Sequence, residues 1–352
     1  MIRADSVMQM LPDTGAVLIT KPENMVYVSS FGGEGAILLK PDGGRYILTD
    51  FRYVEAAQLS SPGWEVLSTN YQKTQSDILS DLLTDENLLY YEDDYVTARE
   101  MNAWKKTFSH LELRPLNEIP EQLRLIKTED EILWTEKAEA ICDQAFTHML
   151  SFLKPGLTEK EVALELYVTM MALGAEGLSF STIVASGVNG SLPHAVPSDK
   201  KLEAGEFVTM DFGCKLHRYC ADFTRTVSLG EPDEELKKIY EITLEANLRA
   251  EDALCAGKSG SEVDAVARDI IKNAGYGDCF GHGLGHGTGL LIHEGPRLSP
   301  SYSGILSENM LTSVEPGIYL PGKGGVRIED LCVVTRDGCR NLTHSEKRLL
   351  IL

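Results

Sequence analysis

Short apolar runs alternate with helical patterns in the first part of the chain. Apolar runs bounded by turn residues predict strands at 15–20, 36–39 and 46–48, whereas apolar residues at helical spacing predict helices over 50–59, 74–83 and 93–108. Two prolines, Pro115 and Pro120, then flank a polar stretch in which no apolar period continues. The pattern predicts an α/β domain over residues 1–120 and a second domain over residues 121–352.

The second domain opens with helix-start signals and continues with strand-like runs. Capping boxes that begin at Thr128 and Thr158 predict helices to about residues 152 and 173, and a third box at Ser261 predicts a helix that ends near Gly275. Apolar β-type runs occupy 207–212, 220–229, 311–320 and 326–335. We therefore expect an α+β domain in which helices pack on a mostly antiparallel sheet.

Charge and composition narrow the class of protein. The 352 residues include 33 Lys and Arg against 53 Asp and Glu, so the net charge is 33 − 53 = −20. Such an acidic surface repels nucleic acid and anionic membranes, so neither is an expected partner. No window of about 18 apolar residues is present and the start lacks the layout of a signal peptide, which predicts a cytoplasmic protein. Seven scattered cysteines without a C-x-x-C pair indicate neither a disulfide framework nor a structural zinc site, and most are expected to be buried.

Two acids lie inside neighbouring apolar runs, where an ionised carboxylate is costly without a compensating charge. Asp211 follows Val208-Thr209-Met210, and Asp222 precedes Phe223-Thr224. If the two runs form a hairpin with an even-numbered loop near 216–218, both carboxylates lie on one face, opposite each other or on a diagonal. An odd-numbered loop would separate them.

The same arrangement recurs near the end of the chain. Glu315 and Glu329 flank the turn at 321–325 and are equidistant from Gly322, since (315 + 329)/2 = 322. One acid in a strand is more often solvated or paired with arginine. Four acids in two similar hairpins favour a site, because like charges that are brought together require cations.

A glycine-rich segment carries three histidines within twelve residues, His282, His286 and His293. Glycine at every second position makes the helix of a zinc-protease H-E-x-x-H pair very unlikely, and the glutamate of that motif is absent. No register of the glycines gives the G-x-G-x-x-G of a dinucleotide loop. The segment is therefore predicted to be an extended loop whose backbone approaches a site closely.

Four carboxylates and one imidazole suit hard or borderline divalent ions, with Mn²⁺ favoured and Co²⁺ or Zn²⁺ as alternatives. A charge of −4 on the carboxylates balances two divalent ions. Two ions about 3.5–4 Å apart activate water and polarise a carbonyl, which is the usual arrangement for metal-assisted hydrolysis.

Five dispersed motifs occur in the order seen in the pita-bread metallopeptidases, and the chain resembles the Xaa-Pro peptidase branch of that family, aminopeptidase P and prolidase. The motifs are Met210-Asp211-Phe212-Gly213, Ala221-Asp222-Phe223-Thr224-Arg225-Thr226, Gly285-His286-Gly287-Thr288-Gly289-Leu290, Val314-Glu315-Pro316-Gly317-Ile318-Tyr319 and Val326-Arg327-Ile328-Glu329-Asp330. The first part of the chain is similar to the creatinase-type N-terminal domain. The resemblance implies that α/β domain followed by a pita-bread catalytic domain.

The resemblance also implies a role for individual residues. Five residues become metal ligands: Asp211, Asp222, His286, Glu315 and Glu329. Of these, Asp222 and Glu329 would bridge two ions. Glu315 would in addition take the proton from the attacking water. Four residues would serve the substrate: His194 shields it, His293 contacts the scissile carbonyl or leaving nitrogen, and His282 and Arg327 line the pocket and support the ligands.

The predicted function is an exopeptidase that removes an N-terminal residue from a peptide or dipeptide with proline second. Arg297 could clamp the C-terminal carboxylate of a dipeptide, or be a surface ion pair, so aminopeptidase and dipeptidase both stay open. The alternatives are a creatinase-like C–N hydrolase without metal and an inactive peptide-binding module. Both usually lose the ligands that this chain keeps. A methionine aminopeptidase fits less well because such enzymes resemble only the second domain.

Two further expectations come from the family. The resemblance implies a homodimer. Relatives commonly have glycine at the tip of the first hairpin, where this chain has Arg218, so the type of that turn is open.

Overall fold

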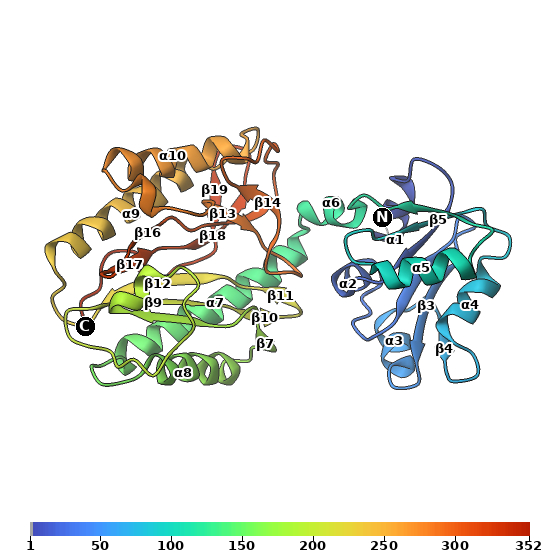
Figure 1. Ribbon diagram of the computed structural model, residues 1–352, viewed down its shortest axis with the longest axis horizontal. Coiled ribbons are helices and arrows are strands. Elements are labelled where there is room, and N and C mark those ends of the chain that lie inside the picture. Colours follow the sequence, from blue (N-terminus) through green and yellow to red (C-terminus); the bar gives the residue numbers. More distant parts are fainter. Residues whose placement is uncertain (1–2) are drawn as a thin grey trace. The chain divides into compact units, whose positions relative to one another are not determined.

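The computed structural model describes residues 3–352 and divides into two compact units, Met1–Arg124 and Leu125–Leu352 (Figure 1). No helix formed by residues 3–352 combines the length and the apolar content needed to cross a membrane.

The first unit is built on a mixed six-stranded sheet with the order β4-β3-β2-β1-β5-β6. Its strands are β1 (Ala16–Ile19), β2 (Ala36–Leu39), β3 (Arg45–Asp50), β4 (Glu65–Thr69), β5 (Leu88–Tyr91) and β6 (Glu112–Pro115). Strands β1–β2 and β2–β3 pair antiparallel, whereas β1–β5, β3–β4 and β5–β6 pair parallel. The first three strands confirm the predicted apolar runs, and the fold of this unit is α/β as predicted.

The helices of this unit are α1 (Arg3–Gln9), α2 (Pro22–Ser29), α3 (Val54–Ser60), α4 (Gln75–Leu82) and α5 (Ala98–Thr107), and α6 (Ile119–Leu125) follows at the boundary with the second unit. The prediction of a helix from residue 93 was wrong at its start. Helix α5 begins after Thr97, whose hydroxyl accepts from the Glu100 N–H in a capping box, and residues 93–95 form a turn after β5. Helix α3 likewise begins four residues later than predicted, because 51–53 form a turn.

The second unit contains four long helices: α7 (Glu129–Phe152), α8 (Glu159–Ala172), α9 (Glu234–Ala253) and α10 (Gly260–Asn273). The predicted capping boxes at Thr128 and Thr158 are both present and start α7 and α8. The prediction at Ser261 was wrong by two residues, because the box that starts α10 joins Ser259 and Glu262. Helix α9 is absent from the prediction. Its start signal is Asp233, whose carboxylate accepts from the N–H groups of Glu235 and Leu236.

The strands of the second unit form antiparallel ladders, as predicted. One sheet has the order β12-β9-β8 and another β14-β13-β15-β18-β19, beside the smaller sheets β11-β10-β7 and β16-β17. Their bounds are β7 (Gly177–Leu178), β8 (Ile183–Ser186), β9 (Phe207–Phe212), β10 (Cys214–Leu216), β11 (Tyr219–Cys220), β12 (Phe223–Ser228), β13 (Gly285–Gly287), β14 (Glu294–Leu298), β15 (Leu311–Val314), β16 (Gly317–Leu320), β17 (Gly324–Arg327), β18 (Asp330–Val334) and β19 (Cys339–Asn341).

Two apolar cores hold these layers together. One joins α7 and α8 to β8, β9 and β12, and the other joins α9 and α10 to the strands from β14 to β18. Figure 1 shows the strands between the two helix pairs, so the sheets are covered on both sides. Four of the seven cysteines are buried in this unit, Cys142, Cys214, Cys220 and Cys332, which confirms the prediction for most of them.

Candidate metal centre

The first pair of acids lies in the hairpin that the sequence predicts. Strand β9 pairs with β12, and β10 pairs with β11, in one continuous register that matches Phe212 with Phe223 and Leu216 with Tyr219. The loop is therefore the even-numbered pair His217-Arg218. Asp211 lies opposite Thr224, which puts Asp222 on the diagonal from Asp211 and on the same face of the hairpin.

The tip of this hairpin lacks glycine and still has left-handed backbone at both loop residues. The φ angles are 47° at His217 and 71° at Arg218, the signature of a type I′ turn. The ring of His217 stacks on Trp134 of α7, with centroids 3.6 Å apart, and the Arg218 N–H donates to Glu176 at 3.2 Å. These contacts oppose the strain that non-glycine residues incur here.

The second pair of acids also lies in a hairpin with the predicted symmetry. Val314 of β15 pairs with Asp330 of β18, and Gly317 of β16 pairs with Arg327 of β17. In one antiparallel register the residue numbers of paired residues have a constant sum, which is 644 for both of these pairs. The numbers of Glu315 and Glu329 also sum to 644, so the two glutamates face each other across the break between the paired strands. The ligand candidates thus lie where the ladder is interrupted.

The two hairpins meet at one backbone bridge, between Thr224 and Glu329. The Glu329 N–H donates to the Thr224 carbonyl at 3.2 Å, and the Thr224 hydroxyl donates to Glu329 Oε2 at 2.7 Å. Thr224 therefore fixes one oxygen of the glutamate. Sequence analysis did not single out Thr224 for this task, although it lies two residues after Asp222.

His286 reaches the four acids from the glycine-rich segment, which is extended as predicted. It lies on β13, whose Gly285 approaches β15 so closely that a Cβ there would be 2.0 Å from the Ser313 carbonyl oxygen. Burial, followed by the charge of His293, lowers the pKa of His286 to about 3, so the ring is neutral. Its Nδ1 lies 3.1 Å from the Gly287 carbonyl and donates to it, which leaves the Nε2 lone pair free.

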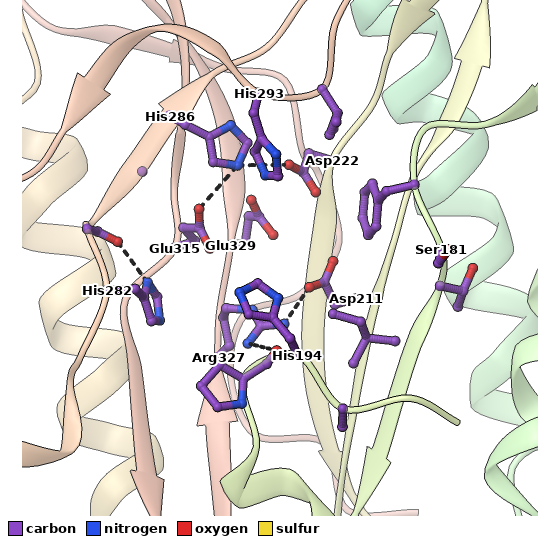
Figure 2. A pocket seen from close by; sticks show the side chains of 18 of the residues that line it. Ser181, His194, Asp211, Asp222, His282, His286, His293, Glu315, Arg327 and Glu329 are labelled. Atoms are coloured by element: carbon purple, nitrogen blue, oxygen red, sulfur yellow. Dashed lines mark hydrogen bonds and ion pairs between the residues drawn. The ribbon is translucent and has the colours of Figure 1, made fainter. Parts of the chain in front are cut away.

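The donors of this site are arranged for a cation. His286 Nε2 lies 3.4 Å from Asp222 Oδ2 and 3.4 Å from Glu315 Oε1. Ligand atoms of Asp222, His286 and Glu329 lie within 4.8 Å of one another. Figure 2 shows their side chains, with that of Glu315, pointing into one space.

Electrostatics also favour a bound cation. Burial and the neighbouring carboxylates raise the pKa of Asp222 and of Glu329 well above the usual range, and burial raises the pKa of Glu315 to about 7. Among the described residues, Asp211 Oδ1 and Glu329 Oε1 have no hydrogen-bond partner although both atoms are buried. The oxygen-rich donor set therefore fits divalent metal.

Arg327 lies beside Asp211 and connects it to residues that the prediction placed around the substrate. Its guanidinium pairs with Asp211 Oδ2 and donates to the Tyr319 hydroxyl at 2.7 Å. Because arginine only donates, the Tyr319 oxygen accepts and its own proton is directed to His282 Nε2, 2.9 Å away. His282 Nδ1 then donates to the Gly283 carbonyl at 2.8 Å, and burial lowers the pKa of His282 to about 4. Tyr319 is a further site residue that sequence analysis missed.

The remaining predicted residues line one cavity of about 630 Å³ with the metal-ligand candidates. His194 is brought to the site by the loop before Pro197, which Arg327 contacts through the Pro193 carbonyl at 3.3 Å. The His293 ring meets that of His286 edge-on, with centroids 4.3 Å apart. Arg297 pairs with His286 in the β13–β14 ladder and also lines the cavity.

Comparison with known proteins agrees with this geometry. Residues 13–126 match the model of the creatinase/prolidase N-terminal domain, and residues 134–336 match that of metallopeptidase family M24. A Pyrococcus furiosus Xaa-Pro dipeptidase is 38% identical over 336 residues, which is 95% of this chain and 94% of that protein.

Solved structures agree over nearly the whole chain. The Xaa-Pro dipeptidase from Bacillus anthracis superposes with a TM-score of 0.96 at 41% identity, covering 99% of both chains. The X-Pro aminopeptidase from Thermotoga maritima gives a TM-score of 0.92 at 37% identity, covering 98% of this chain and 99% of that one. These matches confirm the predicted creatinase-type N-terminal domain and pita-bread second domain. The chain belongs to metallopeptidase family M24 and is a metal-dependent hydrolase.

Proposed function

We propose that this protein is a dinuclear exopeptidase that hydrolyses the bond between an N-terminal residue and a following proline. The observation that carries the proposal is the convergence of one neutral imidazole and the carboxylates of two hairpins, from five sequence-distant positions, on one cavity. Relatives over nearly the full chain are named Xaa-Pro dipeptidase and X-Pro aminopeptidase, which supports the substrate class.

The residues that would hold two ions are Asp211, Asp222, His286, Glu315 and Glu329. Mn²⁺ is the proposed metal and Co²⁺ or Zn²⁺ the alternatives, since oxygen donors dominate. When bound, such ions polarise the scissile carbonyl and lower the pKa of water.

The chain's own groups would supply binding and proton transfer. Glu315 would act as the general base and take the proton of the attacking water. Its Oε1 is oriented by the Ser313 hydroxyl at 3.2 Å. His293 would donate toward the scissile carbonyl or leaving nitrogen, and His194 would exclude water from the bound substrate.

Metal content and peptide hydrolysis test the proposal together. Wild type should bind two divalent ions per chain and cleave Xaa-Pro substrates. Glu315→Gln should lose most of the activity, and His286→Ala should lose metal as well. Unchanged hydrolysis in either variant would contradict the proposal, and a wild type that binds no metal and cleaves no peptide would favour the peptide-binding module.

Substitution of Arg297 tests whether the protein is a dipeptidase or an aminopeptidase. If its guanidinium clamps the C-terminal carboxylate of a dipeptide, Arg297→Met should raise the KM for an Xaa-Pro dipeptide and leave that for an Xaa-Pro-containing tripeptide amide unchanged. A preference of wild type for the tripeptide, with no effect of the substitution, would support an aminopeptidase.

A further inference from the structure

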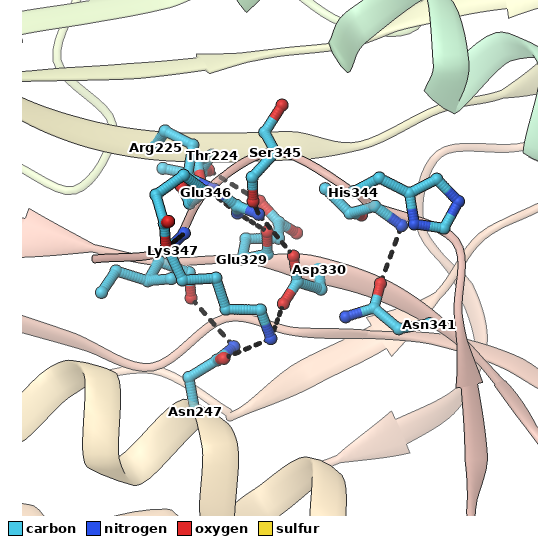
Figure 3. A network of polar contacts seen from close by, with 12 residues as sticks. Thr224, Arg225, Asn247, Glu329, Asp330, Asn341, His344, Ser345, Glu346 and Lys347 are labelled. Atoms are coloured by element: carbon cyan, nitrogen blue, oxygen red, sulfur yellow. Dashed lines mark hydrogen bonds and ion pairs between the residues drawn. The ribbon is translucent and has the colours of Figure 1, made fainter. Parts of the chain in front are cut away.

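A buried polar network lies behind the strands that carry Glu315 and Glu329 (Figure 3). Its members are Arg225, Asn247, Glu251, Asp330 and Lys347. We infer that the C-terminal segment Ser345–Lys347 acts through this network to position the two glutamates for metal binding, an inference that rests on the proposed function. Arg225 and Lys347 are then positioning residues, since neither contacts the glutamate carboxylates.

Arg225 uses its whole guanidinium to join three parts of the chain. The side chain is only 1% exposed. Its Nη1 donates to the carbonyl oxygens of Thr224 and Glu329, its Nη2 to Asp330 Oδ1 and the Ser345 carbonyl, and its Nε to the Glu346 carbonyl. These five bonds account for all five N–H donors of an arginine.

The Arg225 contacts act at Glu329 itself. The peptide of Glu329 is held on both sides, because its carbonyl accepts from Arg225 and its N–H donates to Thr224. With one carboxylate oxygen bound by the Thr224 hydroxyl, only Oε1 lacks a partner among the described residues. The orientation of that oxygen therefore depends on how firmly Arg225 and the segment behind it are held.

Lys347 holds the backbone next to Glu315, as Arg225 holds that of Glu329. Its ammonium pairs with Asp330 and, at 2.7 Å, with both oxygens of Glu251, and it donates to Asn247 Oδ1 at 3.0 Å. The bond to Oδ1 orients the amide so that Asn247 Nδ2 donates to the Val314 carbonyl at 2.9 Å. That carbonyl belongs to the peptide bond that joins Val314 to Glu315.

The cations Arg225 and Lys347 face the carboxyl groups of Asp330 and Glu251 in this network. Removing Lys347 alone would leave Asp330 and Glu251 with one arginine and destabilise the fold whether or not the segment positions a ligand. A fair test therefore removes the two partners together. Lys347→Met with Glu251→Gln removes the cation with its carboxyl partner and retains side chains of similar length.

The experiment titrates metal-free protein with Co²⁺ and follows both affinity and the visible absorption spectrum, which reports the geometry of the ligands. Thermal unfolding of the metal-free proteins is recorded beside it. Asn247→Leu is the second variant, because it removes the amide without changing charge. Arg348→Met is the matched control, since Arg348 is 82% exposed in its side chain and pairs only with Glu346 among the ion pairs of the described residues.

The double variant and Asn247→Leu are expected to bind Co²⁺ about 10- to 100-fold more weakly, the usual effect of removing a group that orients a ligand. Their spectra should change, and Arg348→Met should match wild type. Affinities and spectra identical to those of wild type in both variants would overturn the inference. If the double variant does not fold, Asn247→Leu decides alone.

A wild type that binds no Co²⁺ would refute the proposed function and this inference with it. A wild type that binds Co²⁺ and cleaves Xaa-Pro peptides, beside variants that bind Co²⁺ equally well, would refute only the inference.

Discussion

Replacing Gly285 by alanine tests the close approach that brings His286 to the carboxylates. Gly285 directly precedes His286 on β13, and a Cβ built at this position lies 2.0 Å from the Ser313 carbonyl oxygen of β15. Real Cβ atoms essentially never show contacts under 3.0 Å, so the two strands must separate locally by about 3.0 − 2.0 = 1.0 Å. The oxygen belongs to the backbone, so no rotamer change can relieve the clash.

The size of the effect follows from this displacement. Overpacking of this kind costs about 1–3 kcal/mol of stability. A shift of about 1 Å in a catalytic group typically costs on the order of 100-fold in rate. We therefore expect Gly285→Ala to fold with a lowered Tm, to bind Co²⁺ more weakly, and to lose about 100-fold in kcat/KM on an Xaa-Pro dipeptide.

The matched control lies four residues earlier in the same segment. Gly281 is exposed, has no heavy atom within 4 Å of a built Cβ, and does not need a positive φ. Gly281→Ala should therefore stay within about 0.5 kcal/mol of wild type in stability and keep its activity. Equal activity and Co²⁺ affinity in Gly285→Ala and Gly281→Ala would refute the reasoning.

Three further predictions follow from the same contacts. Arg327→Lys keeps the charge beside Asp211 but cannot also reach Tyr319, so transition-state stabilisation should fall by about 2–3 kcal/mol and kcat/KM by roughly 30- to 160-fold in steady-state assays. An unchanged kcat/KM would contradict the role of the guanidinium fork. In metal-free protein the pKa of His282 falls from 6.5 to about 4, so the unfolded chain binds more protons between these pH values and stability drops as the pH falls from 6.5 to 4. The loss in the free energy of unfolding is at most about 3 kcal/mol. Denaturant unfolding should show a smaller loss in His282→Gln, and identical pH profiles of stability in wild type and variant would contradict this prediction. The four buried cysteines should react with a thiol reagent only on unfolding, because the reagent cannot reach them and burial raises the pKa of Cys220 to about 11. Seven rapidly reacting thiols in the native protein would contradict this prediction.

Local register was predictable from the sequence because it depends on parity and on turn position. The symmetry of Glu315 and Glu329 about Gly322 required no knowledge of distant contacts. The parity of the first loop was left open by the sequence, and the structure gives the even pair His217-Arg218. Helix starts were readable at the capping boxes of Thr128 and Thr158, whereas the box at Thr97 was missed.

Contacts between hairpins were not predictable in the same way. The Thr224–Glu329 bridge joins residues 105 positions apart, and nothing in either local pattern states that the two hairpins are neighbours. Likewise, the role of Tyr319 depends on its position between Arg327 and His282. Only the family resemblance indicated that His194 belongs beside these residues.

The position of Glu315 and Glu329 at a break in the ladder explains why binding donors can coexist with a stable sheet. A residue inside a continuous antiparallel ladder has its side chain direction set by the pleat, so successive residues of one strand alternate between faces. Glu315 and Glu329 lie between the ladders β15–β18 and β16–β17. At these positions the backbone is free of the pleat and must be held by other groups. Thr224, Arg225 and Asn247 supply those bonds, so the residues that orient the ligands are expected to be as necessary for metal affinity as the ligands' own spacing.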